Sequence, residues 1–212
     1  MIIDLTHPIT SGMPVYPGDR NPSFTVRTGY DPEGYLVHDI VMGTHTGTHI
    51  DAPVHYLRDG ISVGRQPVLD ACVGPALVID AIDASKSGEI TVEDIASGLD
   101  GIGRGDRILL ATGWSARYGS PGFFTDFPSL SPGLATWFAK RKIALLGVET
   151  PSLSRSDSDT VHRLLLSAGI IIVESLANLT PLAGKSVFFS AAPLAFSGLD
   201  GSPVRAYADL SS

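Results

Sequence analysis

The sequence contains a single cysteine, Cys72, among its 212 residues. An internal disulfide and a cysteine-based zinc finger are therefore excluded, and Cys72 is expected to be a small buried apolar side chain. No apolar run approaches the ~20 residues that a membrane-spanning helix needs. Basic residues are also few, since 15 Lys and Arg stand against 22 Asp and Glu, a net charge of −7. An extended surface for nucleic acid or anionic membrane needs clustered basic residues and is not expected.

The remaining composition is that of a globular protein. Apolar residues make up 43% of the chain and charged residues 17%, which suits a buried core and argues against intrinsic disorder. Residues 1–5 carry neither the basic region nor the apolar stretch of a signal peptide, so we expect a cytoplasmic protein. Glycine and proline are scattered, and no linker or repeat is evident. We therefore expect one domain spanning residues 1–212.

Short apolar or alternating runs bounded by turn residues predict eight strands. These runs cover residues 2–5, 24–27, 36–41, 76–79, 108–111, 143–148, 170–173 and 187–190. Three segments carry helix signals. Thr91 and Asp94 can cap a helix that ends near residue 98, and Ser131 precedes a proline that opens residues 132–141. A third helix begins at Asp159 and runs through Ser167, with Gly169 as its C-terminal stop. Together these elements predict a mixed α/β fold, with a sheet core and a few covering helices.

Three of the six histidines lie within eleven residues. His45, His49, Asp51 and His55 all occupy odd positions, so an extended chain would direct all four side chains to one face. In a helix, Asp51 would instead lie about 240° round the axis from His45. A straight strand would separate His45 from His49 by ~13 Å, which is too far for one shared ion. We therefore expect a bend near Gly47.

Two imidazoles beside a carboxylate suit a divalent ion such as zinc, with manganese or iron as alternatives. The plainer interpretation is a histidine-rich polar turn. Two residues elsewhere could complete a metal site. His162 lies on the third predicted helix beside Arg163, and its position alone favours an exposed residue. Glu174 closes the apolar run 170–173, where a carboxylate needs a partner or a metal ion to offset its desolvation.

With these residues, the chain resembles the cyclase-type metal-dependent hydrolases, whose best-described members are bacterial kynurenine formamidases. The family signature His-x3-His-x-Asp-x3-His is matched by His45, His49, Asp51 and His55. Further matching blocks follow the family order over nearly the whole chain: Asp4-Leu-Thr-His-Pro8, Val15-Tyr-Pro-Gly-Asp19, Gly147-Val-Glu-Thr-Pro-Ser152, the pair His162 and Glu174, and Leu199-Asp-Gly-Ser-Pro-Val-Arg205.

The resemblance implies an α/β fold of the swivelling β/β/α type, in a single domain that assembles as a homodimer or homotetramer. It also implies a role for each matching residue. The metal ligands would be His45, His49, Asp51, His162 and Glu174, around one or two Zn²⁺ ions with Mn²⁺ as the alternative. His55 would be the catalytic acid and base, and Tyr16 would contact the substrate.

The implied activity is the hydrolysis of an amide-type C–N bond in a small molecule, as in the conversion of N-formylkynurenine to kynurenine and formate. A divalent ion lowers the pKa of water from 15.7 toward ~7. A histidine with a pKa of ~6.5 can then carry the proton to the leaving nitrogen. Tyr16 stands where kynurenine formamidases tend to have tryptophan, and Glu149 where relatives often have aspartate. Three alternatives stay open: an isatin-like cyclic amide hydrolase, a cyclase of the same family, and a metal-binding protein without catalysis.

Overall fold

The computed structural model describes residues 1–210 of the chain. Its strands are β1 (Ile2–Asp4), β2 (Ser23–Thr28), β3 (Val37–Val41), β4 (His49–Asp51), β5 (Val73–Asp80), β6 (Glu89–Ile90), β7 (Arg107–Ala111), β8 (Ser129–Leu130), β9 (Leu145–Val148), β10 (Ile171–Glu174), β11 (Ser186–Ser190), β12 (Gly201–Pro203) and β13 (Tyr207–Asp209). The α-helices are α1 (Gln66–Cys72), α2 (Ile82–Ser85), α3 (Pro132–Arg141) and α4 (Ser158–Ser167). Short 3-10 helices are η1 (Pro53–His55), η2 (Glu93–Gly98), η3 (Trp114–Arg117) and η4 (Thr180–Leu182).

Nine strands form one mixed sheet in the order β1-β13-β11-β5-β7-β9-β10-β4-β12. The middle of the sheet, β5-β7-β9-β10, is parallel, and the strands on either side pair antiparallel. Strands of a parallel sheet are covered on both faces, so their sequences are nearly continuous apolar runs. That is why the sequence pattern located β5, β7, β9 and β10. The expected mixed α/β architecture is confirmed.

Alternate residues of the central strands enter two separate cores, because successive side chains of a strand point to opposite faces. Ile108, Leu146 and Ile172 pack in one core with side chains of α3 and α4. Leu109, Leu145 and Val173 pack in the other core with side chains of α1. Glu174 follows Val173 and therefore points toward the face that α4 covers. This alternation decides on which side of the sheet the candidate site lies.

The helix signals in the sequence are confirmed at α3. The hydroxyl of Ser131 accepts a hydrogen bond from the backbone N–H of Leu134 at 3.1 Å, and Pro132 occupies the first turn. The first expected helix, which ends near residue 98, is wrong in type. Thr91 and Asp94 do cap each other's backbone N–H groups, but the segment they open is the 3-10 helix η2. It is interrupted because Ile95 leaves helical dihedral angles and turns into the core.

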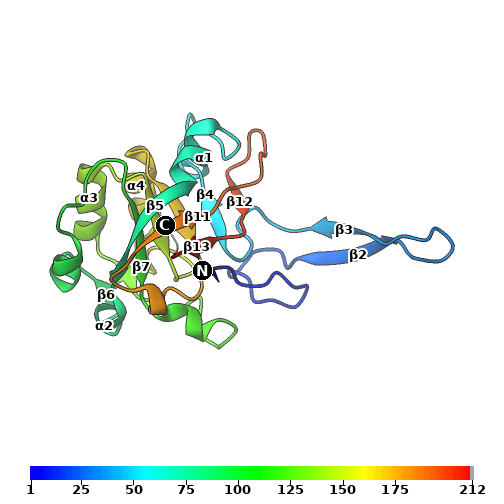
Figure 1. Ribbon diagram of the computed structural model, residues 1–212, viewed down its shortest axis with the longest axis horizontal. Coiled ribbons are helices and arrows are strands. Elements are labelled where there is room, and N and C mark those ends of the chain that lie inside the picture. The colour runs from blue at the N-terminus through cyan, green and yellow to red at the C-terminus, as the bar shows by residue number, and fades with distance from the viewer. Residues whose placement is uncertain (211–212) are drawn as a thin grey trace.

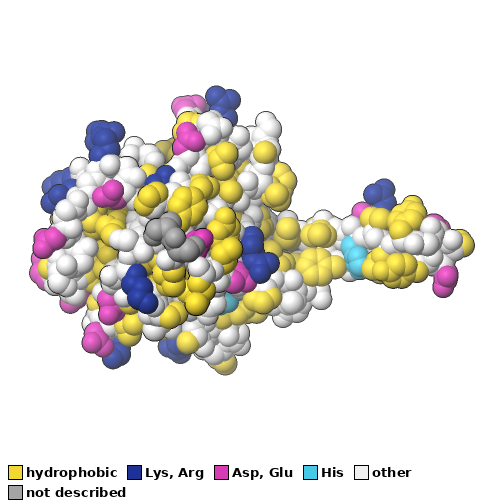
Figure 2. All heavy atoms as spheres, viewed as in Figure 1, with side chains coloured by type: hydrophobic (Ala, Val, Ile, Leu, Met, Phe, Trp, Pro, Cys, Tyr) yellow, Lys and Arg dark blue, Asp and Glu magenta, His cyan; other side chains and the backbone are white. Residues whose placement is uncertain are grey.

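The hairpin of β2 and β3 projects from the body of the molecule as an arm, residues 23–41 (Figure 1). Phe24 pairs with Ile40 and Val26 with His38, so these four side chains share one face. Their apolar members are exposed, and Figure 2 shows hydrophobic side chains along the arm. The opposite face carries the Arg27–Asp39 ion pair at 3.6 Å. The arm is therefore amphipathic, with its apolar face uncovered in the single chain.

Each of the eight predicted strand segments overlaps a strand of the structure. The expectation of a buried Cys72 is also confirmed. Within residues 1–210, no helix combines the length and the apolar character needed to cross a membrane.

Candidate metal centre

The pairing of β4 with β10 builds the floor of the candidate site. His49 lies directly opposite Glu174 in this antiparallel pair, so their side chains share a face, and Asp51 follows two residues later on that face. His49 Nε2 lies 3.3 Å from Asp51 Oδ1 and 3.6 Å from Glu174 Oε2. The expected bend is present at Gly47, whose φ of +63° is readily adopted by glycine. That bend returns the chain so that the preceding histidine meets β4.

His162 reaches the same place from α4. It belongs to the buried face of the helix with Val161, Leu165 and Leu166, and it is only 3% exposed. Its Nε2 lies 3.0 Å from Glu174 Oε1 and 3.5 Å from Asp51 Oδ2. The expectation of an exposed residue, drawn from its position beside Arg163, is therefore wrong. The i, i+3, i+4 spacing of the buried residues shows that His162 is on the side of the helix that packs against the sheet.

Expectations for the histidine segment hold only in part. Only His49 and Asp51 lie in a strand, whereas His45 precedes the bend and His55 ends the 3-10 helix η1. The four residues do not share one extended face, and they converge through the bend and the short helix instead. His45 Nδ1 lies 2.7 Å from Asp51 Oδ1, and the rings of His45 and His55 are 4.2 Å apart between centroids.

Three sets of side chains among the described residues offer ligand atoms within 4.8 Å of one another. Two of them share Asp51: His45, His49 and Asp51, and Asp51, His162 and Glu174. The third set is His45, His55 and Asp200. Asp51 is 1% exposed and Glu174 4% exposed. Among the described residues, the ion-pair partners of both carboxylates are all histidines. Buried carboxylates need a compensating positive charge, and imidazole with carboxylate is a donor set that divalent transition metals take. The residues therefore fit a divalent metal ion.

The same crowding changes the proton affinities of the imidazoles. Burial opposes protonation of His45, but Asp51 and Asp200 outweigh it and raise the pKa of His45 to about 9. Burial likewise opposes protonation of His162, and Asp51 with Glu174 raises its pKa to about 10. For Asp51, burial disfavours the charged form, yet the three histidines around it hold its pKa well below the usual range. The site thus stabilises positive charge in its centre, which is the property a cation site needs.

The ring nitrogens that face away from the shared carboxylates are anchored as well. His49 Nδ1 lies 2.8 Å from the carbonyl oxygen of Gly47, and His162 Nδ1 lies 2.7 Å from that of Ser158. A carbonyl only accepts hydrogen bonds, so both Nδ1 atoms carry a proton and both Nε2 atoms face the carboxylates. This arrangement is typical of metal-binding histidines, whose second nitrogen is held by the protein.

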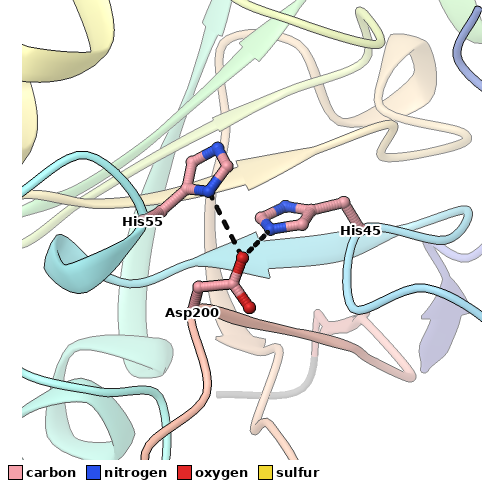
Figure 3. Close-up of side chains that lie close together, drawn as sticks. All are labelled: His45, His55 and Asp200. Carbon is pink, nitrogen blue, oxygen red and sulfur yellow. Dashed lines mark hydrogen bonds and ion pairs between the residues drawn. The ribbon is translucent and has the colours of Figure 1, made fainter. Parts of the chain in front are cut away.

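Asp200 is a site residue that the sequence interpretation did not assign. Its Oδ2 lies 2.9 Å from His45 Nε2 and 3.5 Å from His55 Nδ1, so that one carboxylate faces both histidines (Figure 3). The signal was present in the matching block of residues 199–205, which contains a carboxylate next to a glycine. Its partner histidines lie about 150 residues earlier, so nothing in the local pattern joined them.

A cavity of about 470 Å³ opens onto these residues. Tyr16, Tyr118 and Phe124 line it on one side, and the rings of Tyr16 and Phe124 meet edge to face at 5.9 Å. Tyr16 is placed there by a turn in which the backbone N–H of Asp19 donates to the carbonyl of Tyr16 at 2.9 Å. The expected substrate-contacting residue therefore lies in the cavity wall, close to an aromatic neighbour.

Glu149 has a different position. It is fully buried and is not among the residues that line the cavity. Its carboxylate accepts hydrogen bonds from the backbone N–H groups of Thr112, Gly113 and Leu179 and from the hydroxyls of Thr112 and Ser115. It therefore ties together the loops that follow β7 and β10, and within residues 1–210 no hydrogen bond or ion pair joins it to the candidate ligands.

A stretch that matches the motif of a serine nucleophile does not form a nucleophile elbow in the structure. The stretch Gly60-Ile-Ser-Val-Gly64 does match the letters Gly-x-Ser-x-Gly. A nucleophile elbow joins a strand to a helix, however, whereas this stretch follows η1 and precedes α1. Ser62 is also not among the residues that line the cavity.

Comparisons with known proteins agree with one another. The Cyclase family model matches residues 3–155. The kynurenine formamidase of Bacillus cereus (strain ZK / E33L) is 34% identical over 208 residues, which cover 96% of this chain and 95% of that protein. Isatin hydrolase A from Labrenzia aggregata bound to benzyl benzoate is 30% identical, with a TM-score of 0.88 over 98% of this chain and 93% of its own. A potential metal-dependent hydrolase with cyclase activity is 32% identical, with a TM-score of 0.83 over 98% of this chain and 96% of its own.

Proposed function

The chain belongs to the Cyclase family, and from this premise we propose that it is a metal-dependent hydrolase that cleaves N-formylkynurenine into kynurenine and formate. The observation that carries the proposal is the pair of ligand sets joined by Asp51, with His55 beside them at a cavity of about 470 Å³. The likeness to kynurenine formamidase over nearly the whole of both chains supports the choice of substrate.

We propose that His45, His49, Asp51, His162 and Glu174 hold one or two Zn²⁺ ions, with Mn²⁺ as the alternative. When bound, such an ion acidifies water and polarises a carbonyl oxygen. Asp51 belongs to both ligand sets, which suits a carboxylate that contacts two ions. Three histidine nitrogens and two carboxylates are borderline and hard ligands, the mixture that zinc and manganese accept.

His55 is the proposed acid and base. Burial lowers the pKa of His55; the carboxylates of Asp51 and Asp200 oppose this effect, and the neighbouring His45 and His162 add to it. The net pKa lies below the ordinary value of 6.5, which favours a neutral imidazole that can take the proton of the attacking water. The water oxygen then forms a bond to the formyl carbon as the bond from that carbon to the aryl nitrogen breaks. His55 returns its proton to this nitrogen, which leaves as the amine, and the formyl group leaves as formate.

The aromatic side of the cavity is the proposed place for the aryl ring. Tyr16 and Phe124 form an edge-to-face pair there, and packing against such a pair stabilises the binding of a planar aromatic ring. We therefore propose that Tyr16 contacts the aryl ring of the substrate.

A panel of substrates tests the proposal. Metal-analysed protein is assayed with N-formylkynurenine, formanilide and isatin, and the Asp51→Asn variant serves as the metal-site control. We expect kcat/KM for N-formylkynurenine to exceed that for isatin at least tenfold. Faster turnover of isatin would favour the cyclic amide hydrolase, an alternative that the likeness to isatin hydrolase A supports. If metal-loaded protein hydrolyses none of the three, the enzymatic proposal fails and a metal-binding protein is the better description.

We also propose that residues 1–212 form one domain that assembles as a homo-oligomer, a dimer at least. The apolar face of the arm supports this assembly, since an isolated two-stranded hairpin is marginally stable in water and gains from a covering surface. The cytoplasmic location stays a prediction from the sequence.

A further inference from the structure

His45, His49 and His162 each have one ring nitrogen close to Asp51 or Glu174. The other ring nitrogen of each histidine contacts a second acceptor, which we call its anchor. For His49 and His162 the anchor is a backbone carbonyl oxygen. For His45 the nitrogen that faces Asp51 is Nδ1, and the opposite nitrogen, Nε2, faces the side chain of Asp200 at 2.9 Å. Of these three anchors, only that of His45 is a carboxylate.

Asp200 is held in place by contacts on three sides. Its backbone carbonyl accepts a hydrogen bond from the N–H of Ala52 at 2.9 Å, which fixes it beside the end of β4. The hydroxyl of Thr44 donates to Oδ1 at 3.1 Å, which leaves Oδ2 for the histidines. The next residue, Gly201, lies so close to β4 that a Cβ atom there would meet the carbonyl oxygen of Ile50 at 2.7 Å and Cε1 of His45 at 2.9 Å. The backbone at Asp200 is therefore fixed beside β4, and the Thr44 hydroxyl orients its carboxylate toward the histidines.

We propose that Asp200 is a positioning residue that orients both His45 and His55. By accepting the Nε2 proton of His45, Asp200 fixes the tautomer in which the Nδ1 lone pair is available to a metal ion beside Asp51. The general principle is that a carboxylate on the far nitrogen of a ligand histidine orients the ring and increases its basicity. This inference rests on the proposed function only in taking His45 as a metal ligand and His55 as the acid and base.

The second half of the proposal concerns His55. The same oxygen of Asp200 lies 3.5 Å from Nδ1 of His55, and the rings of the two histidines pack at 4.2 Å between centroids (Figure 3). A carboxylate at this distance favours the tautomer that carries its proton on Nδ1, and Nε2 then has the lone pair that can take the proton of the water. Asp200 thereby links the proposed metal ligand His45 to the proposed acid and base His55.

The experiment measures metal affinity and turnover separately in Asp200→Ala and Asp200→Asn. Zn²⁺ affinity is determined by competition with a chromophoric chelator, which needs no substrate. We expect Asp200→Ala to weaken the affinity about 10- to 100-fold and to lower kcat by a similar factor, with KM within about threefold of the parent. Asp200→Asn keeps an oxygen that can accept the His45 proton, so it should recover part of the affinity. Asp100→Asn removes an exposed carboxylate outside the cavity and is the matched control.

Two outcomes would overturn the assignment. One is a folded Asp200→Ala or Asp200→Asn protein with the parent's Zn²⁺ affinity and kcat. The other is the loss of one full metal equivalent per chain in Asp200→Asn, because Asp200 would then be a ligand. If the parent protein itself binds no Zn²⁺, it is the proposed metal chemistry that fails, and this is distinguishable because the parent is measured first.

Discussion

Asp51 is the residue that joins the two halves of the candidate centre. It belongs to both ligand sets and lies near three histidines. We expect Asp51→Asn to lose bound metal, because the amide carries no charge to offset that of the ion, and to lose turnover with it. His55→Ala should retain its metal while kcat falls about 10²- to 10⁴-fold, the range for removal of an acid–base group. Metal analysis and steady-state kinetics on both variants check this difference.

The two variants serve as controls for each other. His55→Ala with full activity would remove the acid–base role, and Asp51→Asn with the parent's metal content would remove Asp51 from the ligand set. The exposed Asp100→Asn should match the parent in both measurements.

At the scale of residues, the sequence predicted most of the side chains that the structure brings together in the candidate site. The spacing of His45, His49 and Asp51 pointed to a metal before any resemblance was considered. The burial of His162 could not be read from the neighbouring Arg163, because a helix places adjacent residues about 100° apart. Asp200 was missed since its contacts with His45 and His55 exist only through the pairing of β12 with β4.

At the scale of elements, the arm has an apolar face that nothing covers in the single chain. We expect Phe24→Ser combined with Ile40→Ser to weaken self-association, since together they remove two large apolar side chains from one face. Burying one such side chain contributes about 1.5–3 kcal/mol, so the dissociation constant should rise at least tenfold. Sedimentation velocity over a range of protein concentrations measures the change.

Thr25→Ser alters the opposite face of the arm and should leave the association unchanged. A parent protein that sediments as a monomer at all concentrations, or a double variant that associates as the parent does, would contradict the assigned role of the arm.

The elements that sequence reasoning found and missed differ in where their stability comes from. The central strands are buried on both faces, and their apolar composition alone made them visible. β4 and β12 are three residues long and contain His49, Asp51 and Ser202, so their strand character comes from pairing with distant residues. The helix signals at Ser131 and Pro132 succeeded because a cap is local chemistry. The signals at Thr91 and Asp94 predicted the start of a helical segment correctly. They did not predict that this segment is a 3-10 helix, because that depends on the packing of Ile95 in the core.

At the scale of the whole molecule, we expect the candidate centre to couple the free energy of unfolding to pH and to metal binding. Without metal, the pKa values of about 9 for His45 and about 10 for His162 exceed the ordinary value of 6.5. Groups with a raised folded-state pKa contribute stability that is fully present below pH ~6.5 and is lost as the pH rises through the folded values. We therefore expect metal-free protein to lose at least ~1 kcal/mol of its unfolding free energy between pH 6.5 and 10.

A bound divalent ion replaces those protons, and metal-loaded protein should be stabilised more as the pH rises across the same range. Calorimetric unfolding with chelator and with Zn²⁺ gives the difference between the two forms at each pH. The other titrating groups contribute to both forms, so the difference reports on the centre. Parallel curves for the two forms from pH 6.5 to 10 would show that these histidines do not exchange protons for metal.

The pairing of β12 with β4 also determines when the centre can form during protein synthesis. Asp200 and His45 are separated by 155 positions in the chain, and β4 lies between β10 and β12 in the sheet. A ribosome makes His45, His49 and Asp51 early, whereas Glu174 and then Asp200 emerge only near the end. A nascent chain therefore exposes half of the candidate centre through most of its translation, and Glu174 and Asp200 join that half only when β10 and β12 pair on either side of β4.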